Sequence, residues 1–259
     1  LYRPFHLKDY AGGVFSIVDS TFVERLNLSA GGFSALYGNK LSGVMEINSL
    51  EDITQRQYHL GASFINLRAG GQGNFNQGDG EWLIAARRGY LDLILSLDGE
   101  EENQVSPAFG DLFMKISQQL NNEHRLAVRV LSAVDDMELS NRYQERDYFV
   151  DESLDSFYGN HYLWLSLDSD WSLDLSSVTK LATGQVKEDR NGYKLDPAVI
   201  DVWVNDFRQF DFIDFNQQWQ LNWQDDQLWQ FGFGVLSAKA EYDYRSQRVL
   251  FKSFDQQRQ

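Results

Sequence analysis

A glycine-rich stretch, GGFSALYGNKLSGVMEIN at positions 31–48, is the first place in this 259-residue sequence where the residue types could do chemistry. Glycine-rich loops can cradle phosphate groups with their backbone N–H groups, so a phosphate-binding loop is the first hypothesis. The stretch lacks the closing Gly-Lys-Ser/Thr of such a loop and runs into an apolar, strand-like tail. The glycines therefore indicate close backbone packing, and Tyr37 would fill the space or present its hydroxyl.

Other catalytic and metal-binding patterns are missing from the sequence. It contains no G-x-S-x-G elbow and no H-E-x-x-H motif, and its four histidines have no metal-ligand spacing. The GGQGNF segment at 70–75 lacks the spacing and the βαβ context of a dinucleotide fingerprint. Adjacent acids such as Asp135 and Asp136 fall in predicted connections, where turn chemistry explains them. We expect no enzyme activity, no catalytic residues, no metal site and no cofactor.

The composition excludes some partners and some folds. A formal net charge of −15 and a pI near 4.6 argue against a nucleic-acid backbone as partner. The absence of cysteine excludes disulfides within the chain. No apolar run reaches the roughly 18 residues of a membrane-spanning helix, a test that does not exclude a barrel. The sequence begins mid-pattern at Leu1 without a signal peptide, which suggests a mature or excised segment.

Period-two alternation of apolar and polar residues is the main structural signal. In RLAVRVLSAV, Leu126, Val128 and Val130 share one face of the predicted strand, and Arg125 and Arg129 share the other. The same pattern recurs in several further stretches: 111–120, 164–178 and 215–223. We therefore predict a mainly β protein whose strands have one apolar and one strongly polar face.

Three features favour a membrane barrel over a two-sheet sandwich. The polar faces repeatedly carry Gln, Asn, Asp and Lys, as a wet or filled lumen requires. Trp171, Trp219, Trp223 and Trp229 crowd predicted tight turns, as in an interfacial girdle, although ordinary cross-strand packing would also place them there. Predicted connections alternate between short ones (76–80, 121–124, 168–170 and 224–227) and long charged ones (96–110, 135–156 and 186–206). This rhythm predicts about nine strands, beginning with 58–65 and 68–75.

Two further features of the predicted strands and loops have more than one interpretation. Arg87 and Arg88 are adjacent in a predicted strand and must point to opposite faces. A lipid-facing Arg at the membrane midplane costs roughly 2–4 kcal/mol, so one would enter the lumen and seek a carboxylate or carbonyl. The alternative is a pair that snorkels at the membrane edge. The acidic loop 135–155 could contact a ligand or Ca²⁺, but it lacks EF-hand spacing and fits a solvated loop.

The segment VERLNLSAGGFSALYGNKLSGVMEINS at 23–49 resembles the end of the plug domain of TonB-dependent outer-membrane receptors. The residues that match the family's pattern are Val23, Glu24, Arg25, Gly31, Ala35, Tyr37, Gly38, Gly43, Val44 and Ile47. RRGYLD at 87–92 and AFGDLFMKI at 108–116 resemble an early barrel segment of one branch, so the resemblance covers about residues 10–135. Ala30 and Ser42 depart from the pattern, so a family lock at Ala30 would be absent or rebuilt around Arg25.

The resemblance implies a fold and a function. Residues 1–52 would be the C-terminal part of an α/β plug domain, and 53–259 the N-terminal part of a transmembrane antiparallel β-barrel. Such a barrel has roughly 22 strands, of which this chain would supply about nine. The site residues carried over or chosen as plug–barrel contacts are Arg25, Gly31, Tyr37, Gly38, Gly43, Arg87 and Arg88.

The implied activity is active import across the outer membrane of a Gram-negative bacterium. The receptor would bind a scarce small-molecule solute such as a metal chelate or a glycan, which the sequence does not identify. The TonB energy-transducing complex would act through a segment outside this chain. The alternatives are a passive porin or structural barrel protein and a soluble glycan-binding β-sandwich. An outer-membrane hydrolase barrel would need a Ser–His–acid constellation that these residues do not supply.

Overall fold

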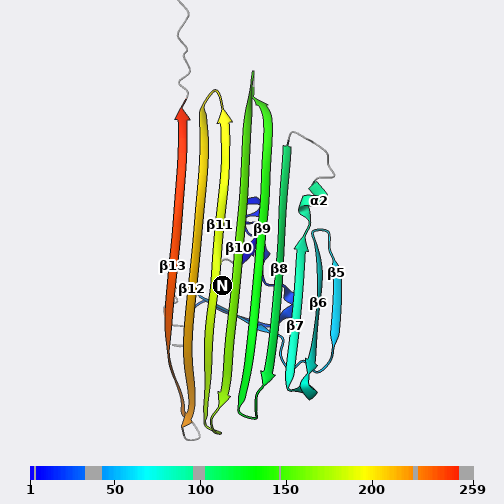
Figure 1. The fold of residues 1–259 in the computed structure, drawn as a ribbon, viewed down its shortest axis with the longest axis vertical. Helices are drawn as coiled ribbons and strands as arrows, with labels where there is room; N and C mark the ends of the chain where they lie inside the picture. Colours follow the sequence, from blue (N-terminus) through cyan, green and yellow to red (C-terminus); the bar gives the residue numbers. More distant parts are fainter. Residues whose placement is uncertain (3, 33–42, 96–102, 146, 224–226, 251–259) are drawn as a thin grey trace, which may run out of the picture.

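A computed structural model describes residues 1–2, 4–32, 43–95, 103–145, 147–223 and 227–250. Most of them belong to a single nine-stranded antiparallel sheet in which every strand pairs with the next along the chain (Figure 1). The strands are β5 (Gln57–Ala62), β6 (Asn66–Phe75), β7 (Gly80–Gly89), β8 (Asn103–Gln119), β9 (His124–Glu145), β10 (Tyr148–Asp170), β11 (Leu175–Asp196), β12 (Ile200–Trp223) and β13 (Gln227–Leu250). The predictions of a mainly β chain and of about nine strands are confirmed.

The sheet is an open meander. Strands β5 and β13 are its two edges, so the described residues do not form a closed barrel. The β6–β7, β8–β9 and β10–β11 connections all lie at one end of the sheet, the lower end in Figure 1, where β12 also ends and β13 begins. We call it the short-turn end, because the predicted short connections fall there. Trp171, Trp223 and Trp229 lie at this end, and each is more than half exposed.

The predicted long loops at 135–156 and 186–206 are wrong. These residues continue β9, β10, β11 and β12 as strands of 22 to 24 residues; β10 begins at Tyr148, soon after β9 ends at Glu145, and β11 and β12 are joined by 197–199. Their polar side chains suggested loops, but many of them pair across neighbouring strands, as Arg142 does with Asp151 at 3.3 Å. Cross-strand pairs of this kind stabilise a ladder without apolar residues. The predicted loop at 96–110 is wrong from Asn103 onward, because β8 begins there. Residues 96–102 lie outside the described residues.

We call residues 1–52 the N-terminal segment, and contacts of its described residues hold it against one face of the sheet (Figure 1). Their short elements are β1 (Phe5–His6), α1 (Lys8–Ala11), β2 (Phe15–Ser16), the 3-10 helix η1 (Ser20–Phe22), β3 (Val23–Ser29) and β4 (Val44–Ser49). β1 pairs with β2 and β3 with β4. The described residues of the segment do not show an α/β domain of its own. The remaining short elements, the 3-10 helix η3 (Asn76–Gly78) and α2 (Leu91–Leu95), flank β7.

The two faces of the sheet differ as the alternation predicted. We call the face beneath the N-terminal segment the covered face and the opposite one the uncovered face. On β8, Lys115 is 1% exposed on the covered face, whereas its neighbour Ile116 is 52% exposed on the uncovered face. On β9, Arg125 and Arg129 lie on the covered face and Val128 on the uncovered one. Charged side chains are therefore buried on the covered face of these strands, and apolar ones are exposed on the other face.

An apolar core joins the segment to the middle of the covered face. Its buried members are Ile17, Phe22, Ile53, Leu83, Ala85, Phe113, Leu131, Ala133, Tyr162, Val186 and Phe212. The rings of Phe22 and Phe113 stack with their centroids 3.9 Å apart. No described helix is long and apolar enough to cross a membrane.

Candidate functional site

The contact between the N-terminal segment and the covered face is the candidate site, because buried charges concentrate there. Its most enclosed part is built around His6 on β1, whose residue is fully buried. His6 Nδ1 lies 2.7 Å from Asp135 Oδ1 on β9, and His6 Nε2 lies 3.1 Å from Asp111 Oδ2 on β8. The Leu7 backbone N–H also donates to Asp135 Oδ1, at 3.3 Å. Two carboxylates therefore accept from one imidazole, an arrangement that requires both ring nitrogens to carry protons.

The environment of His6 favours the imidazolium form. Burial by itself lowers the pKa of the imidazole, because it disfavours the charged form. Hydrogen bonds and charge attraction from Asp111 and Asp135 act in the opposite direction and raise the pKa above its ordinary value of 6.5. The second effect is the larger, because the ring contacts two carboxylates rather than one.

Arg87 on β7 extends this cluster toward Ser16 and Asp19 of the segment. Its guanidinium contacts Asp111 Oδ2 at 2.7 Å and donates to the backbone carbonyl of Ser16 on β2. It also lies 3.8 Å from Asp19, which caps η1 by accepting from the Thr21 N–H. Arg87 therefore joins a carboxylate of the sheet to a carbonyl and a carboxylate of the segment.

An aromatic ring closes the His6 cluster against the sheet. Phe109 on β8 lies 4.7 Å from the His6 ring and 5.7 Å from the Phe15 ring, and the Arg87 guanidinium lies 5.5 Å from its centroid. The ring fits because its neighbour on β7 is Gly89, where a Cβ would lie 2.0 Å from the ring. Glycine at 89 therefore leaves room for the Phe109 ring, and this ring covers the cluster.

A second group of charges lies where the segment joins the sheet. Lys115 Nζ donates to the Leu50 carbonyl at 2.6 Å and lies 3.6 Å from Glu51. Arg129 on β9 also lies 3.6 Å from Glu51. The Ile53 N–H donates to Glu81 at 3.0 Å. The chain is thus held to three strands at the point where the segment ends.

A third group holds α1 to the far half of the sheet. Asp9 on α1 accepts from the Tyr158 hydroxyl on β10 and lies 3.7 Å from Arg190 on β11. Arg190 also contacts Asp206 on β12, a residue that is fully buried. Arg208 contacts the same carboxylate at 2.8 Å. The carboxylates of the covered face are therefore paired in chains that run from strand to strand, as buried charges require.

The uncovered face has the opposite composition. Near its short-turn end, one cross-strand row contains only apolar residues on six strands: Ile116, Val128, Leu165, Leu181, Phe215 and Val235. On β13, four successive uncovered positions are Trp229, Phe231, Phe233 and Val235, each more than half exposed. The next positions along the same face are polar, beginning with Ser237, Lys239, Glu241 and Asp243. The apolar surface is therefore a band with a sharp upper border.

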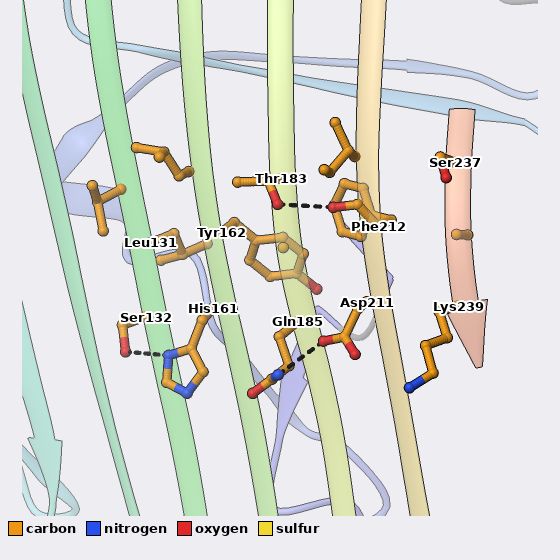
Figure 2. Close-up of a pocket in the computed structure, with 15 residues that line it drawn as sticks. Leu131, Ser132, His161, Tyr162, Thr183, Gln185, Asp211, Phe212, Ser237 and Lys239 are labelled. Atoms are coloured by element: carbon orange, nitrogen blue, oxygen red, sulfur yellow. Dashed lines mark hydrogen bonds between the residues drawn. The ribbon is translucent and has the colours of Figure 1, made fainter. Parts of the chain in front are cut away.

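A hollow of about 750 Å³ marks this border (Figure 2). Most of its lining residues belong to the uncovered face of β9 to β13. Ser132 pairs with His161 at 2.9 Å, and the Gln185 amide donates to Asp211 at 2.8 Å. The polar side chains of this row satisfy one another, and Lys239 on β13 continues the row.

The structure separates the two adjacent arginines. Arg87 lies on the covered face with its side chain 9% exposed and contacts the segment. Arg88 lies on the uncovered face, 52% exposed, and pairs with Asp92 on α2 at 2.9 Å. This is the placement that the alternation required, and Arg87 has the carboxylate and carbonyl partners that a covered arginine needs.

The other predicted site residues take no part in the described contact. Arg25 is exposed on β3 opposite Asn48 and makes no ion pair with another described residue. Gly31 is exposed with open space where a Cβ would point, whereas a Cβ on Gly43 would lie 3.0 Å from the Ser29 carbonyl. Close backbone packing is therefore seen at Gly43 and not at Gly31. Tyr37 and Gly38 lie outside the described residues.

Sequence reasoning missed most of the residues that hold the segment. His6, Asp9 and Asp19 were not singled out, because each partner on the sheet lies 49 or more residues away. Their only local signal is position: His6 and Asp9 fall in a short polar stretch before the recognisable motif. Asp135 was interpreted as a turn residue, but it is buried in β9.

The side chains at this contact are suited to ion pairing and, at His6, to proton binding. Among the described residues, no group of His, Cys, Asp or Glu side chains has the arrangement of a metal site. In comparisons with known proteins, no family model matches the chain and no curated protein matches it. The fold and the site define a class: an open antiparallel sheet with a polar, covered face and an apolar, uncovered band.

Proposed function

We propose that this chain is part of a TonB-dependent receptor of a Gram-negative outer membrane. In this proposal residues 1–52 are the end of a plug, and β5 to β13 are the first strands of the transmembrane barrel. The receptor binds an external small-molecule solute, such as a metal chelate or a glycan, and imports it with energy from the TonB complex. The fold supports the β-sheet part of this proposal, and the motif resemblance at 23–49 supports the remainder.

The observation that carries the membrane part of the proposal is the inverted polarity of the sheet. Ionic residues such as Lys115, Asp111 and Asp206 are buried on the covered face, while Ile116 and Phe231 are more than half exposed on the other. A soluble protein buries its apolar face instead. A sheet that exposes an apolar band and buries a polar face fits a lipid-facing barrel with a filled lumen.

The height of the band agrees with this interpretation. On β13 the band runs from Gln227 to Ser237, which is on the order of ten residues or about 34 Å along the strand. A strand tilt of about 40° reduces this to a height of about 26 Å, close to the roughly 25 Å band of outer-membrane barrels. The strands from β9 to β13 are twice as long as a membrane crossing needs. Their upper halves would project outside the membrane as rigid hairpins.

The contacts of the N-terminal segment fit a plug in a lumen. Three groups of charged contacts, one of them at the half-exposed Glu51, join the segment to strands from β7 to β11. A passive porin needs no such element inside its barrel, so these contacts favour a plugged receptor over the porin alternative. Charged contacts can be exchanged for water when a plug moves, which apolar packing cannot do without greater cost.

Deleting residues 1–50 from the complete protein tests the plug directly. The wild-type protein in a planar lipid bilayer should be closed, and the deletion variant should form a constantly open pore. Equal conductance before and after deletion would exclude the plug and favour the porin. A matched variant in which Asp9 and Glu51 are replaced by Asn and Gln should open only intermittently, because the apolar core around Phe22 is kept.

A soluble glycan-binding sandwich is the second candidate, and the exposed tryptophans near the short-turn end are the feature that favours it. The described residues form one large sheet and two two-stranded ones, so no second sheet covers the apolar band. The two candidates differ in solubility. The membrane receptor requires detergent or lipid to remain monodisperse, whereas the sandwich would fold and stay dispersed in buffer alone.

A further inference from the structure

We propose that His6 and its two carboxylate partners, Asp111 and Asp135, form a proton-dependent latch between the N-terminal segment and the sheet. When the imidazole carries both protons, it donates to a carboxylate on β8 and to one on β9. When it loses one proton, one of these contacts loses its hydrogen bond and both lose their charge attraction. The start of the segment is then held less tightly.

The geometry leaves no substitute for the second proton. His6 is fully buried, and both Asp111 and Asp135 are more than nine-tenths buried, so water does not replace the lost hydrogen bond freely. A neutral imidazole keeps one donor and one acceptor, and an acceptor facing a carboxylate is repulsive. The cost of deprotonation therefore falls on the contact between segment and sheet, and not on either element alone.

The surrounding charges preserve the latch. Facing groups come from several elements: Asp111 on β8, Asp135 on β9, Arg87 on β7, Asp19 before η1, and Lys8 and Asp9 on α1, with Tyr158 of β10 bound to Asp9. Arg87 already satisfies Asp111 in part and remains charged throughout the physiological range. Asp135 receives only His6 and the Leu7 N–H among the contacts of the described residues. His6 is thus the group in this cluster whose charge changes near neutral pH.

The direction of the pH effect follows from the raised pKa of His6 in the attached state. Below the ordinary value of about 6.5, the imidazole is protonated whether the segment is attached or not, and the latch contributes fully. Its contribution is lost as the pH rises through the attached-state pKa. Attachment of residues 5–7 should therefore weaken on the alkaline side of neutrality.

The latch rests on the contact geometry, and only its role in gating rests on the proposed function. In a receptor whose plug must leave the barrel wall, the latch would make that step easier in alkaline than in acidic surroundings. Each unit by which attachment raises the pKa corresponds to roughly a tenfold preference of the protonated form for the attached state. The gating role and the latch can therefore fail separately.

The titration of His6 in the complete protein, purified in detergent and labelled with ¹⁵N-histidine, tests the latch. The chain has four histidines, and the His6 signal is the one lost in His6→Gln. We expect the midpoint of the His6 titration to lie above the ordinary value of 6.5. Asp135→Asn should lower that midpoint. A midpoint at or below 6.5 would overturn the proposal.

Exchange protection of the Leu7 amide, corrected for the intrinsic rate at each pH, measures attachment. In the wild type this protection should fall as the pH rises from 6 to 9. The total fall should be roughly tenfold for each unit by which attachment raises the pKa of His6. His6→Lys keeps a cation at this position and should make protection independent of pH, whereas His6→Gln should lower it throughout. His161→Gln, on the uncovered face, is the matched control and should behave like the wild type. Unchanged protection in His6→Gln would contradict the latch, whatever the conductance of the 1–50 deletion.

Discussion

The two faces of the sheet use the same strands and the same backbone ladder but follow opposite rules. On the covered face charged side chains are buried and paired, as Lys115 is with Glu51 and the Leu50 carbonyl. On the uncovered face apolar side chains such as Leu181 and Val235 are exposed toward the short-turn end, and polar ones lie beyond them. Because the backbone is common to both, the difference must reflect what each face contacts. The covered face contacts the N-terminal segment through an apolar core and ion pairs, whereas no other described sheet covers the apolar band.

Loss of one buried carboxylate should have the largest effect on this arrangement. Asp111→Ala leaves both Arg87 and His6 buried without their shared carboxylate, and removing one partner of a buried ion pair costs about 3–5 kcal/mol. Urea unfolding of the complete protein in detergent, followed by tryptophan fluorescence, measures the change.

The matched control for that loss lies on the uncovered face. Asp92→Asn breaks the exposed pair with Arg88, and such pairs contribute about 0–1 kcal/mol. Equal effects of the two substitutions would mean that the covered face is not buried in solution, and the contrast between the faces would disappear.

A charge placed in the apolar band should have the next largest effect. Leu181 is 41% exposed on the uncovered face of β11, in the row that is apolar across six strands. Leu181→Arg would cost about 2–4 kcal/mol if the band faces lipid near the membrane midplane. Asn191→Arg, ten residues further along the same face of β11, should cost close to nothing, because polar residues surround it. Folding yields in lipid vesicles measure both, and a harmless Leu181→Arg would favour a soluble protein.

The packing of the latch gives a smaller effect. A Cβ on Gly89 would lie 2.0 Å from the Phe109 ring, so Gly89→Ala must displace the ring that covers His6. Overpacking of this kind costs about 1–3 kcal/mol. Gly31→Ala is the control, since a Cβ there meets nothing within 4 Å. Gly89→Ala should lower the free energy of unfolding more than Gly31→Ala does. A harmless Gly89→Ala would show that Phe109 is not held in place.

The local part of this structure could be predicted from the sequence, and the long-range part could not. Alternation has a period of two residues, so the opposite placement of Lys115 and Ile116, and of Arg87 and Arg88, follows from their neighbours alone. Strand count and the positions of the short turns follow from the same signal. The lengths of β9 to β12 did not follow from this signal, because polar residues on both faces of their upper halves resemble those of loops.

The site shows the same division. Arg87 was recognised because its strand could be predicted, but its partners Asp19 and Ser16 belong to a segment with almost no periodicity. His6 and Asp135 are 129 residues apart, and no local pattern brings them together. The glycine motif at 31–48 identified the right part of the chain, while the contacts that attach it come from either side of the motif, at Asp19 and at Glu51.

Loss of an exposed ion pair that lies beyond the upper border of the apolar band should have the smallest effect. Asp243 on β13 accepts from the Arg245 guanidinium at 2.7 Å, and both side chains are largely exposed. Asp243→Asn should change the free energy of unfolding by less than about 0.5 kcal/mol, and added salt should remove even that difference because it screens exposed charges. Titrating the variant and the wild type with urea at low and high salt measures both quantities. A salt-independent cost above about 1.5 kcal/mol would mean that this row is covered in the complete protein, so that the uncovered face ends lower than the described strands suggest.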